Sequence, residues 1–499
     1  MTRRLASIAL MALMLSSAGP AAAGGKPIDS VDAREFRFGA MAIGQAKDVD
    51  YARAEGLGLV PTIPMNDHLN EILAKLLAQS PVKNIPARVY IRASGDWAAK
   101  TTADANIYVA LGVLLRVDNE DEVAALLAHE ASHVILGHAD ADIVQDAQQR
   151  AIQVSSLALE TRDFVKNVGK QGATNATGRD SAGVTEQSRA LLLNTMLLAP
   201  AWTRDQERNA DLLGTDLLVR AGYSPQGMVT LLEKQKSFET ERAADATAQS
   251  LDQQLSGFGV DIGATATAEA TKQVGGDQAL GALAGAAIGK ALQWGSKKVD
   301  EAKRAHPKTE ERIADTQAYI QRYYADSAGK APQVDPWDDA KDQDATADVL
   351  ENYIAAIQAK GKLSAGDVAG ASKLSKASLT GATRKHAYPN YVDAAVQIAQ
   401  GGTAPALTDY ETALSGPEPA GAIYSEASAL YLQTGKQDKA KQVIEAGYSK
   451  LQEPPSLTLP LIRTYRMIGR QADADRVAAQ CAVRWPKMQA VCSQEAKGQ

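Results

Sequence analysis

The stretch EVAALLAHEASHVIL, residues 122–136, contains His129, Glu130 and His133 in the order His-Glu-x-x-His. Its apolar residues recur at helical spacing, and acidic residues precede it, as is typical of a helix N-terminus. Side chains four residues apart leave the same face of a helix, so both imidazoles can bind one metal ion. Glu130 stands beside them, where a carboxylate can act as a general base. The stretch therefore predicts a helix that carries a catalytic metal centre.

A second pair of residues supplies the ligand that this centre still needs. A catalytic zinc ion takes three protein ligands and keeps one position open. Glu207 and Asp211 are four residues apart in a helix predicted over residues 204–220, and they share one of its faces. We expect Glu207 to be the third ligand and Asp211 to orient an imidazole through a hydrogen bond. The predicted cofactor is one zinc ion per chain, bound by His129, His133 and Glu207.

These motifs resemble those of the gluzincin peptidases of the CAAX prenyl protease and HtpX type. The resemblance rests on His129-Glu130-x-x-His133, on Glu207-x-x-Ala210-Asp211, and on His306-Pro307 with Arg312-Ile313 after it. It covers about residues 57–313, and it is specific at the metal motifs and loose elsewhere. Asn209 stands where many members carry a second Glu, but that position is not a ligand in the family. The resemblance implies a mainly α metallopeptidase domain with a small β-sheet, over residues 24–325.

The remaining histidines have less defined roles. The resemblance implies an active-site role for His306, either as a fourth ligand that closes the resting zinc site or as a catalytic donor to the oxyanion. The two roles predict opposite effects of His306→Ala on proteolysis, and the sequence leaves both open. His138 lies five residues after His133, a poor spacing for a shared helical face, so we expect it to be structural or to support a ligand. We expect His68 and His386 at the surface.

Two short stretches predict strands in the same part of the chain. RVYIR, residues 88–92, alternates in polarity, and NIYVA, residues 106–110, is rich in β-forming side chains. We expect residues 106–110 to form a sheet edge with which an extended substrate pairs through its backbone. Such pairing selects substrates for being unfolded, because it does not depend on their side chains.

Two glycine-rich stretches between the motifs are candidate covers of the site. Residues 169–188 predict a loop, and Gly281, Gly285 and Gly289 form a smooth stripe if that stretch is helical. Lids are drawn from weakly packed segments because they must open readily. The stripe is either part of a tightly packed surface hairpin or an element that touches a membrane or gates substrate.

The N-terminus has the three-part pattern of a secretory signal peptide. Arg3 and Arg4 precede an apolar run over residues 5–15, and small residues then lead to Ala23. The run is shorter than the roughly 20 residues that cross a bilayer, which argues against a membrane anchor. We therefore expect residues 1–23 to be removed and the protein to be exported, which in a Gram-negative cell means to the periplasm.

Composition limits the classes of function further. The formal net charge is −6, so nothing indicates the clustered basic surface of a nucleic-acid-binding protein. Aromatic residues make up only 5% of the chain, which favours aliphatic, Ala-rich cores between packed helices. The 2 cysteines, Cys481 and Cys492, are too few for a disulfide-rich scaffold. The sequence leaves open whether they pair or remain two buried thiols.

The C-terminal part contains a 34-residue repeat. Tyr431, Gly435, Ala440 and Val443 recur as Tyr465, Gly469, Ala474 and Val477, and Gly401 and Ala406 lie one period upstream. This period is typical of tetratricopeptide repeats, in which Gly ends the first helix of each pair and Ala lets the second pack closely. Stacked repeats form a concave protein-binding surface. We expect such a helical domain over residues 347–499, after an Asp- and Pro-rich linker at residues 326–346.

The signal peptide and the repeats narrow the resemblance to the BepA-like periplasmic subgroup, which is implicated in outer-membrane protein assembly and quality control. The leading hypothesis is a periplasmic zinc endopeptidase of misfolded or misassembled envelope and outer-membrane proteins. Its expected partners are unfolded substrates and, through the repeats, the outer-membrane assembly machinery. Two alternatives remain: a chaperone or scaffold in which proteolysis is secondary, and an exported peptidase of small peptides.

Overall fold

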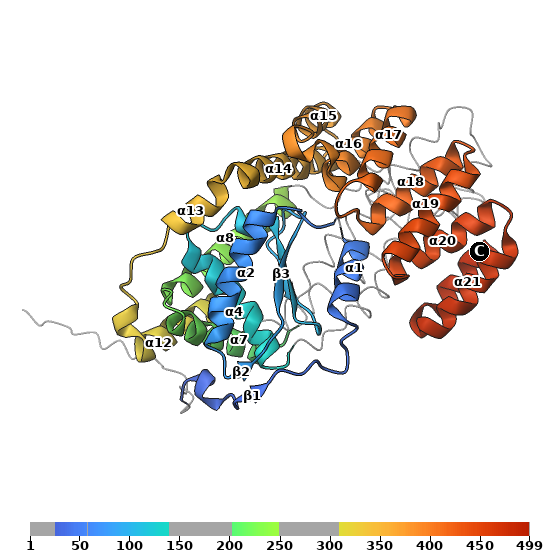
Figure 1. Ribbon diagram of the computed structural model, residues 1–499. Coiled ribbons are helices and arrows are strands. Elements are labelled where there is room, and N and C mark those ends of the chain that lie inside the picture. Colours follow the sequence, from blue (N-terminus) through green and yellow to red (C-terminus); the bar gives the residue numbers. More distant parts are fainter. Residues whose placement is uncertain (1–24, 57, 139–201, 249–308, 499) are drawn as a thin grey trace, which may run out of the picture.

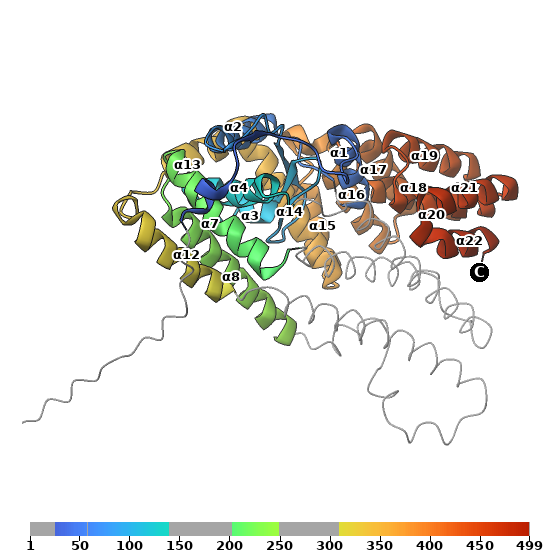
Figure 2. The same cartoon turned by 90° about the horizontal axis from the view of Figure 1, so that it is seen from below.

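The computed structural model describes residues 25–56, 58–138, 202–248 and 309–498. These residues are mainly helical, with a small sheet in the N-terminal part (Figure 1, Figure 2), which confirms the predicted fold class. The strands are β1 (Arg34–Glu35), β2 (Val82–Lys83), β3 (Arg88–Arg92), β4 (Ala99–Thr101) and β5 (Asn106–Ala110). The helices before the repeats are α1 (Gln45–Glu55), α2 (Ile63–Ala78), α3 (Leu111–Leu114), α4 (Glu120–Ile135), α7 (Arg204–Arg220), α8 (Gln226–Ala248) and α12 (Thr309–Tyr323).

Helix α4, which carries the His-Glu-x-x-His motif, lies at the centre of this part. Every residue of α4 is buried, and α2, α7, α8 and β4 pack around it. The acids at its start do more than complement the helix dipole. The Tyr223 hydroxyl donates a hydrogen bond to Glu120, and the Ser224 backbone N–H donates one to Asp121. The turn between α7 and α8 is thereby tied to the N-terminus of α4.

The three-stranded sheet has the order β3-β5-β4. Strand β5 pairs parallel with β3 and antiparallel with β4, so the prediction that residues 106–110 form a sheet edge was wrong. All five residues of β5 are buried. A central strand covered on both faces has a continuous run of buried residues, and five residues of sequence do not distinguish it from an edge strand. Among the strands that the structure describes, β4 is the edge beside α4.

The C-terminal part consists of helix pairs, which Figure 1 shows as an arc running away from the sheet. Its helices are α14 (Asp344–Ser364), α15 (Val368–Ala377), α16 (Ala387–Ala399), α17 (Thr403–Ser415), α18 (Gly421–Gln433), α19 (Gln437–Lys450), α20 (Pro455–Met467), α21 (Gln471–Arg484) and α22 (Gln489–Lys497). Helices α16, α18 and α20 begin 34 residues apart, as do α17, α19 and α21.

The small residues of the repeat have the predicted roles. Gly401, Gly435 and Gly469 follow the first helix of each pair with φ between 74° and 82°, a left-handed conformation that favours glycine. Ala406, Ala440 and Ala474 in the second helices are fully buried. The 34-residue helical repeat is therefore present, while its assignment to the tetratricopeptide family stays a prediction.

The segment predicted as a linker is anchored to the N-terminal part of the structure, which contains α4. It contains the helix α13 (Asp335–Asp342), in which Trp337 is fully buried. The indole N–H of Trp337 donates to the Val117 carbonyl at 3.2 Å, and the Gln333 N–H donates to the Asp121 carboxylate at 2.7 Å. Composition misses this anchor because a single buried aromatic residue provides it. One hydrophobic core extends from Ile28 to Ala440, so the N-terminal part and the first repeats share it. The exact domain boundaries stay a prediction.

Helix α1 lies between the sheet and the repeats in Figure 1, and it contacts both β5 and α18. On the sheet side, Asp48 accepts hydrogen bonds from the side chains of Thr102, Asn106 and Tyr108. On the repeat side, Tyr51 is fully buried, and its ring packs edge to face against Trp485.

A disulfide between Cys481 and Cys492 ties α21 to α22, which settles the alternative that the sequence left open. Glu495 of α22 adds a second tie, because its buried carboxylate accepts hydrogen bonds from Arg463 and Arg466 of α20.

Several predictions lie outside the described residues. These are the signal peptide over residues 1–23, the loop at residues 169–188, the glycine stripe at residues 281–289, and His306. Among the helices that are described, none is long and apolar enough to cross a membrane.

Candidate metal centre

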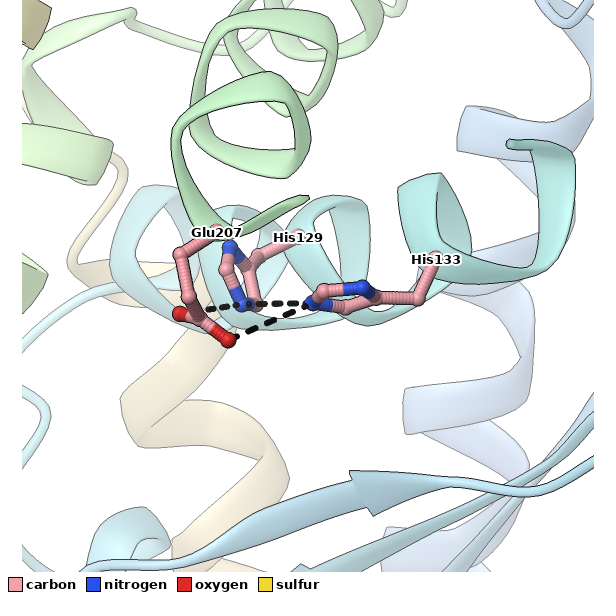
Figure 3. Close-up of side chains that lie close together, drawn as sticks. All are labelled: His129, His133 and Glu207. Carbon is pink, nitrogen blue, oxygen red and sulfur yellow. Dashed lines mark hydrogen bonds and ion pairs between the residues drawn. The ribbon is translucent and has the colours of Figure 1, made fainter. Parts of the chain in front are cut away.

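The three predicted ligands lie together on two helices. His129 and His133 project from α4 toward Glu207 of α7 (Figure 3). The two Nε2 atoms are 3.2 Å apart, and the Glu207 oxygens lie 3.7 Å from His129 Nε2 and 3.8 Å from His133 Nε2. Two ligand atoms that each lie 2.0–2.1 Å from a tetrahedral zinc ion are roughly 3.3 Å apart. The residues present therefore fit a metal ion of this kind.

Close packing of α7 on α4 brings Glu207 to the histidines. A Cβ atom at Gly214 would lie 3.1 Å from the His129 backbone nitrogen, so only glycine allows this approach without a shift. A capping box then fixes where α7 begins. The Thr203 hydroxyl accepts from the Gln206 N–H, and the Gln206 side chain accepts from the Thr203 N–H. Glu207 follows immediately and is thereby held at the helix N-terminus.

Asp211 fixes the tautomer of His129. Its Oδ1 lies 2.9 Å from His129 Nδ1, and a carboxylate can only accept a hydrogen bond. Nδ1 therefore carries the proton, and Nε2 presents its lone pair to the centre. Burial opposes ionisation of Asp211, but the charge and hydrogen bonds of Arg312 lower its pKa to about 2. Burial likewise lowers the pKa of His129, and the hydrogen bond and charge of Asp211 more than reverse this.

Arg312 is a buried cation to which the sequence analysis gave no role. From α12, its Nε and Nη2 atoms donate to the two oxygens of Asp211 at 2.7 Å each. Its Nη1 lies 3.1 Å from Glu207 Oε2, and the Arg312 side chain is only 10% exposed. Arg312 thus connects the third ligand to the carboxylate that orients His129. The only signal for it in the sequence is its place after His306-Pro307 in the family resemblance.

Glu130 points from α4 toward the edge strand β4. The residue is buried, and its Oε2 accepts a hydrogen bond from the Thr101 hydroxyl at 2.6 Å. Burial raises the pKa of Glu130 above its ordinary value, against the effects of His129 and of the Thr101 hydrogen bond. Thr101 has no recognisable signal in the sequence, because no spacing rule links a strand residue to a helix residue 29 positions later.

His133 is enclosed on the side away from the centre. Its Nδ1 lies 3.1 Å from His138 Nδ1, and its ring stacks on Trp202 with 4.5 Å between the centroids. Burial, with the charge of His129, lowers the pKa of His133 well below its ordinary value. The neutral form of the ring is the one that binds a metal ion. His138 contacts a predicted ligand, in line with the expectation that it supports one.

We expected the two other histidines that the structure describes to lie at the surface, but both are half-buried. His68 is half-buried, with Nε2 3.1 Å from Glu120 Oε2. His386 is also half-buried, and its ring packs edge to face against Tyr353. Neither belongs to the group of His129, His133 and Glu207 that can hold a metal ion.

Comparison with known proteins places this centre in a family. The sequence profile described as peptidase family M48 matches residues 65–320, just over half of the chain. The chain belongs to peptidase family M48. The match includes both helices of the centre and most of α12, and it confirms the resemblance drawn from the sequence motifs.

Individual relatives are distant and match only in part. The β-barrel assembly-enhancing protease of Escherichia coli (strain K12) is 25% identical over 198 residues, which are 39% of this chain and 38% of that protein. Metalloprotease LoiP of the same strain is 31% identical over 157 residues, 32% of this chain and 54% of that protein. The mitochondrial metalloendopeptidase OMA1 of Schizosaccharomyces pombe is 25% identical over 176 residues, 35% of this chain and 45% of that protein. The chain thus spans about half or less of the length of these relatives.

Proposed function

We propose that this protein is a zinc-dependent endopeptidase that hydrolyses misfolded or misassembled proteins of the cell envelope. The observation that carries the proposal is the convergence of His129, His133 and Glu207, with Glu130 directly after His129 on α4. Two imidazole nitrogens and one carboxylate oxygen at near-tetrahedral spacing favour zinc among the common divalent metals. Membership of a peptidase family supports peptide bonds as the substrate.

The chain's own residues divide the work of hydrolysis. A zinc ion held by His129, His133 and Glu207 would supply Lewis-acid polarisation of water and of the scissile carbonyl. Glu130 accepts the proton of the attacking water and then delivers it to the leaving amine. Asp211 holds the His129 lone pair toward the centre.

The geometry also supports a way of selecting substrate. Strand β4 pairs with β5 on one side, and its Thr101 contacts Glu130. An extended peptide that adds to the other side of β4 would place its backbone along the centre. Because backbone pairing requires an extended chain, unfolded proteins are the expected substrates. This assigns to β4 the part that the sequence analysis gave to residues 106–110.

Four observations support an envelope role. The N-terminal sequence pattern predicts export, and the Cys481–Cys492 disulfide suits an oxidising compartment such as the periplasm. One relative bears the name β-barrel assembly-enhancing protease. The helical repeat offers a surface for binding substrates or the outer-membrane assembly machinery.

The test compares the zinc-loaded protein with its Glu130→Gln variant on unfolded casein. Loss of a general base lowers turnover by about 10²–10⁴-fold, so the variant should be nearly inactive while it retains zinc. Glu311→Gln, an exposed change on α12, is the control and should behave as the parent. Undiminished casein cleavage by Glu130→Gln would refute the mechanism.

The same variant separates the alternatives. Crosslinking in cells should trap envelope proteins on Glu130→Gln, since substrate binds but is not released by cleavage. A cellular phenotype that Glu130→Gln rescues as well as the parent does would favour a scaffold. Cleavage of short peptides without cleavage of casein would favour a small-peptide enzyme.

A further inference from the structure

Thr101 occupies the junction between the edge strand and the motif helix. It is the last residue of β4 and pairs with Ile107 of the buried strand β5. Its side chain is turned to α4 and the residue is completely buried. The Thr101 oxygen lies 2.6 Å from Glu130 Oε2 and 3.1 Å from the Glu130 backbone carbonyl oxygen.

The hydroxyl proton of Thr101 goes to the carboxylate. A hydroxyl carries a single proton, and both neighbouring Glu130 oxygens are acceptors. The shorter distance and the negative charge of the carboxylate favour Oε2, because charge-assisted O–H···O⁻ bonds are short and strong. The hydrogen bond to Oε2 fixes the rotation of the Glu130 carboxylate. The other carboxylate oxygen, Oε1, does not accept this bond.

The support behind Thr101 is itself rigid. The next residue, Thr102, donates through its hydroxyl to Asp48 at 3.0 Å, and its backbone N–H donates to the Asn106 carbonyl. Asp48 is fully buried on α1 and also accepts from the Tyr108 hydroxyl at 2.7 Å. The end of β4 is therefore clamped from α1 as well as from β5, so the Thr101 hydroxyl has a fixed position from which to orient Glu130.

We infer that Thr101 is a positioning residue for Glu130, which fixes one carboxylate oxygen so that the other receives the proton of the attacking water. The inference rests on the proposed function, in which Glu130 is the general base. It links substrate binding to catalysis, because β4, the strand that would pair with an extended peptide, also carries the residue that orients Glu130. Thr101 does not touch the reacting atoms, so its effect should appear in turnover rather than in substrate binding.

The experiment uses Thr101→Val, which keeps the shape of the side chain and removes the hydroxyl, and Thr101→Ser, which keeps the hydroxyl. Thr458→Val is the matched control, because Thr458 of α20, within the repeats, is equally buried and its hydroxyl donates to the backbone carbonyl of Pro454 just before that helix. The readouts are kcat and KM on casein, zinc per chain, the urea midpoint, and acetohydroxamate affinity by calorimetry. A hydroxamate bound at such a centre gives its proton to the general base. Its affinity therefore depends on the orientation of the Glu130 carboxylate and can be measured without turnover.

For Thr101→Val we expect kcat to fall about 10–100-fold and hydroxamate affinity about tenfold, as for other residues that hold a catalytic group in place. KM and zinc content should be unchanged, and the urea midpoint should move no more than for Thr458→Val. Thr101→Ser should restore most of the lost kcat. If Thr101→Val is as active as an active parent, the inference about Thr101 is wrong but the proposed function stands. Equal losses for Val and Ser would overturn it by assigning the effect to packing, and an inactive zinc-loaded parent would overturn the proposed function with it.

Discussion

Replacing Arg312 with Met should destabilise the metal-free protein far more than any exposed charge change on the same helices. The guanidinium neutralises two carboxylates, those of Asp211 and Glu207, whose side chains are 2% and 9% exposed. Met keeps most of the length and apolar contact of the Arg stem but leaves both acids without their cation. Removing one partner of a buried ion pair costs about 3–5 kcal/mol, a large share of the roughly 5–15 kcal/mol by which proteins are folded.

The metal ion should reduce this loss. A divalent cation at the centre supplies positive charge near Glu207 and near the His129–Asp211 pair, so the zinc-loaded variant should lose less stability than the metal-free one. Urea unfolding followed by tryptophan fluorescence, in chelator and with zinc, measures both losses. Arg208→Met is the control. Arg208 pairs with Asp315 across the same two helices at 2.7 Å, but these side chains are 45% and 48% exposed. Exposed pairs contribute about 0–1 kcal/mol.

The refuting result is specific. If Arg312→Met and Arg208→Met lower the urea midpoint equally in chelator, the buried ion pair contributes no more than an exposed one. The assignment of Arg312 as the electrostatic partner of the centre would then be wrong. If zinc makes no difference to the Arg312→Met loss, the metal does not bind next to Glu207.

Three other predictions follow from the described contacts. Metal analysis of protein purified without chelator should find about one zinc per chain, and Glu207→Gln should lose it, because a neutral amide is a poorer ligand. Asp409→Asn should raise the melting temperature at pH 8 but not at pH 3. Burial and the nearby Asp393 raise the pKa of Asp409 to about 7, so its contribution is complete below the ordinary pKa of 3.8 and is lost as pH rises through 7; a parallel pH profile in the variant would contradict this. Reduction of the Cys481–Cys492 disulfide, whose cysteines are 11 residues apart, should lower stability by about 3 kcal/mol, and unreduced native protein should bind no thiol reagent.

The grouping of the predicted ligands could be predicted from the sequence because much of their geometry is local. Four residues along a helix bring two side chains to the same face, so His129 with His133, and Glu207 with Asp211, each form a pair before any packing is known. Only one unknown remained, namely whether the two faces meet. In the structure the two faces meet because Gly214 lets α7 approach α4 closely. The sequence does not indicate which backbone a lone helical glycine approaches.

Arg312 and Thr101 could not be predicted in the same way. They lie 101 and 29 residues from their partners, on elements whose contact with the centre is set by packing. Neither has a periodic spacing to a ligand. The wrong prediction that residues 106–110 form a sheet edge has a related cause. Strand order depends on long-range pairing, whereas the five residues of β5 indicate only that this strand is buried.

The 34-residue repeat was predictable for the opposite reason. Each unit contacts its neighbour in the same way, so the constraints recur in the sequence at the period of the structure. The Tyr431 hydroxyl donates to Glu411, and one period later the Tyr465 hydroxyl donates to Glu445, which shows the same contact built twice.

Contacts from several elements support the helix and the strand that carry the centre. Helix α4 is fixed at its start by Asp121, which receives hydrogen bonds from the α7–α8 turn and from the segment before α13. Its motif face is fixed by α7, and the strand beside Glu130 is clamped through Asp48 of α1. Helix α1 in turn packs into the repeats through Tyr51. Because catalytic groups act best on a rigid support, the repeats contribute to the centre structurally, by covering the helix that holds its edge strand.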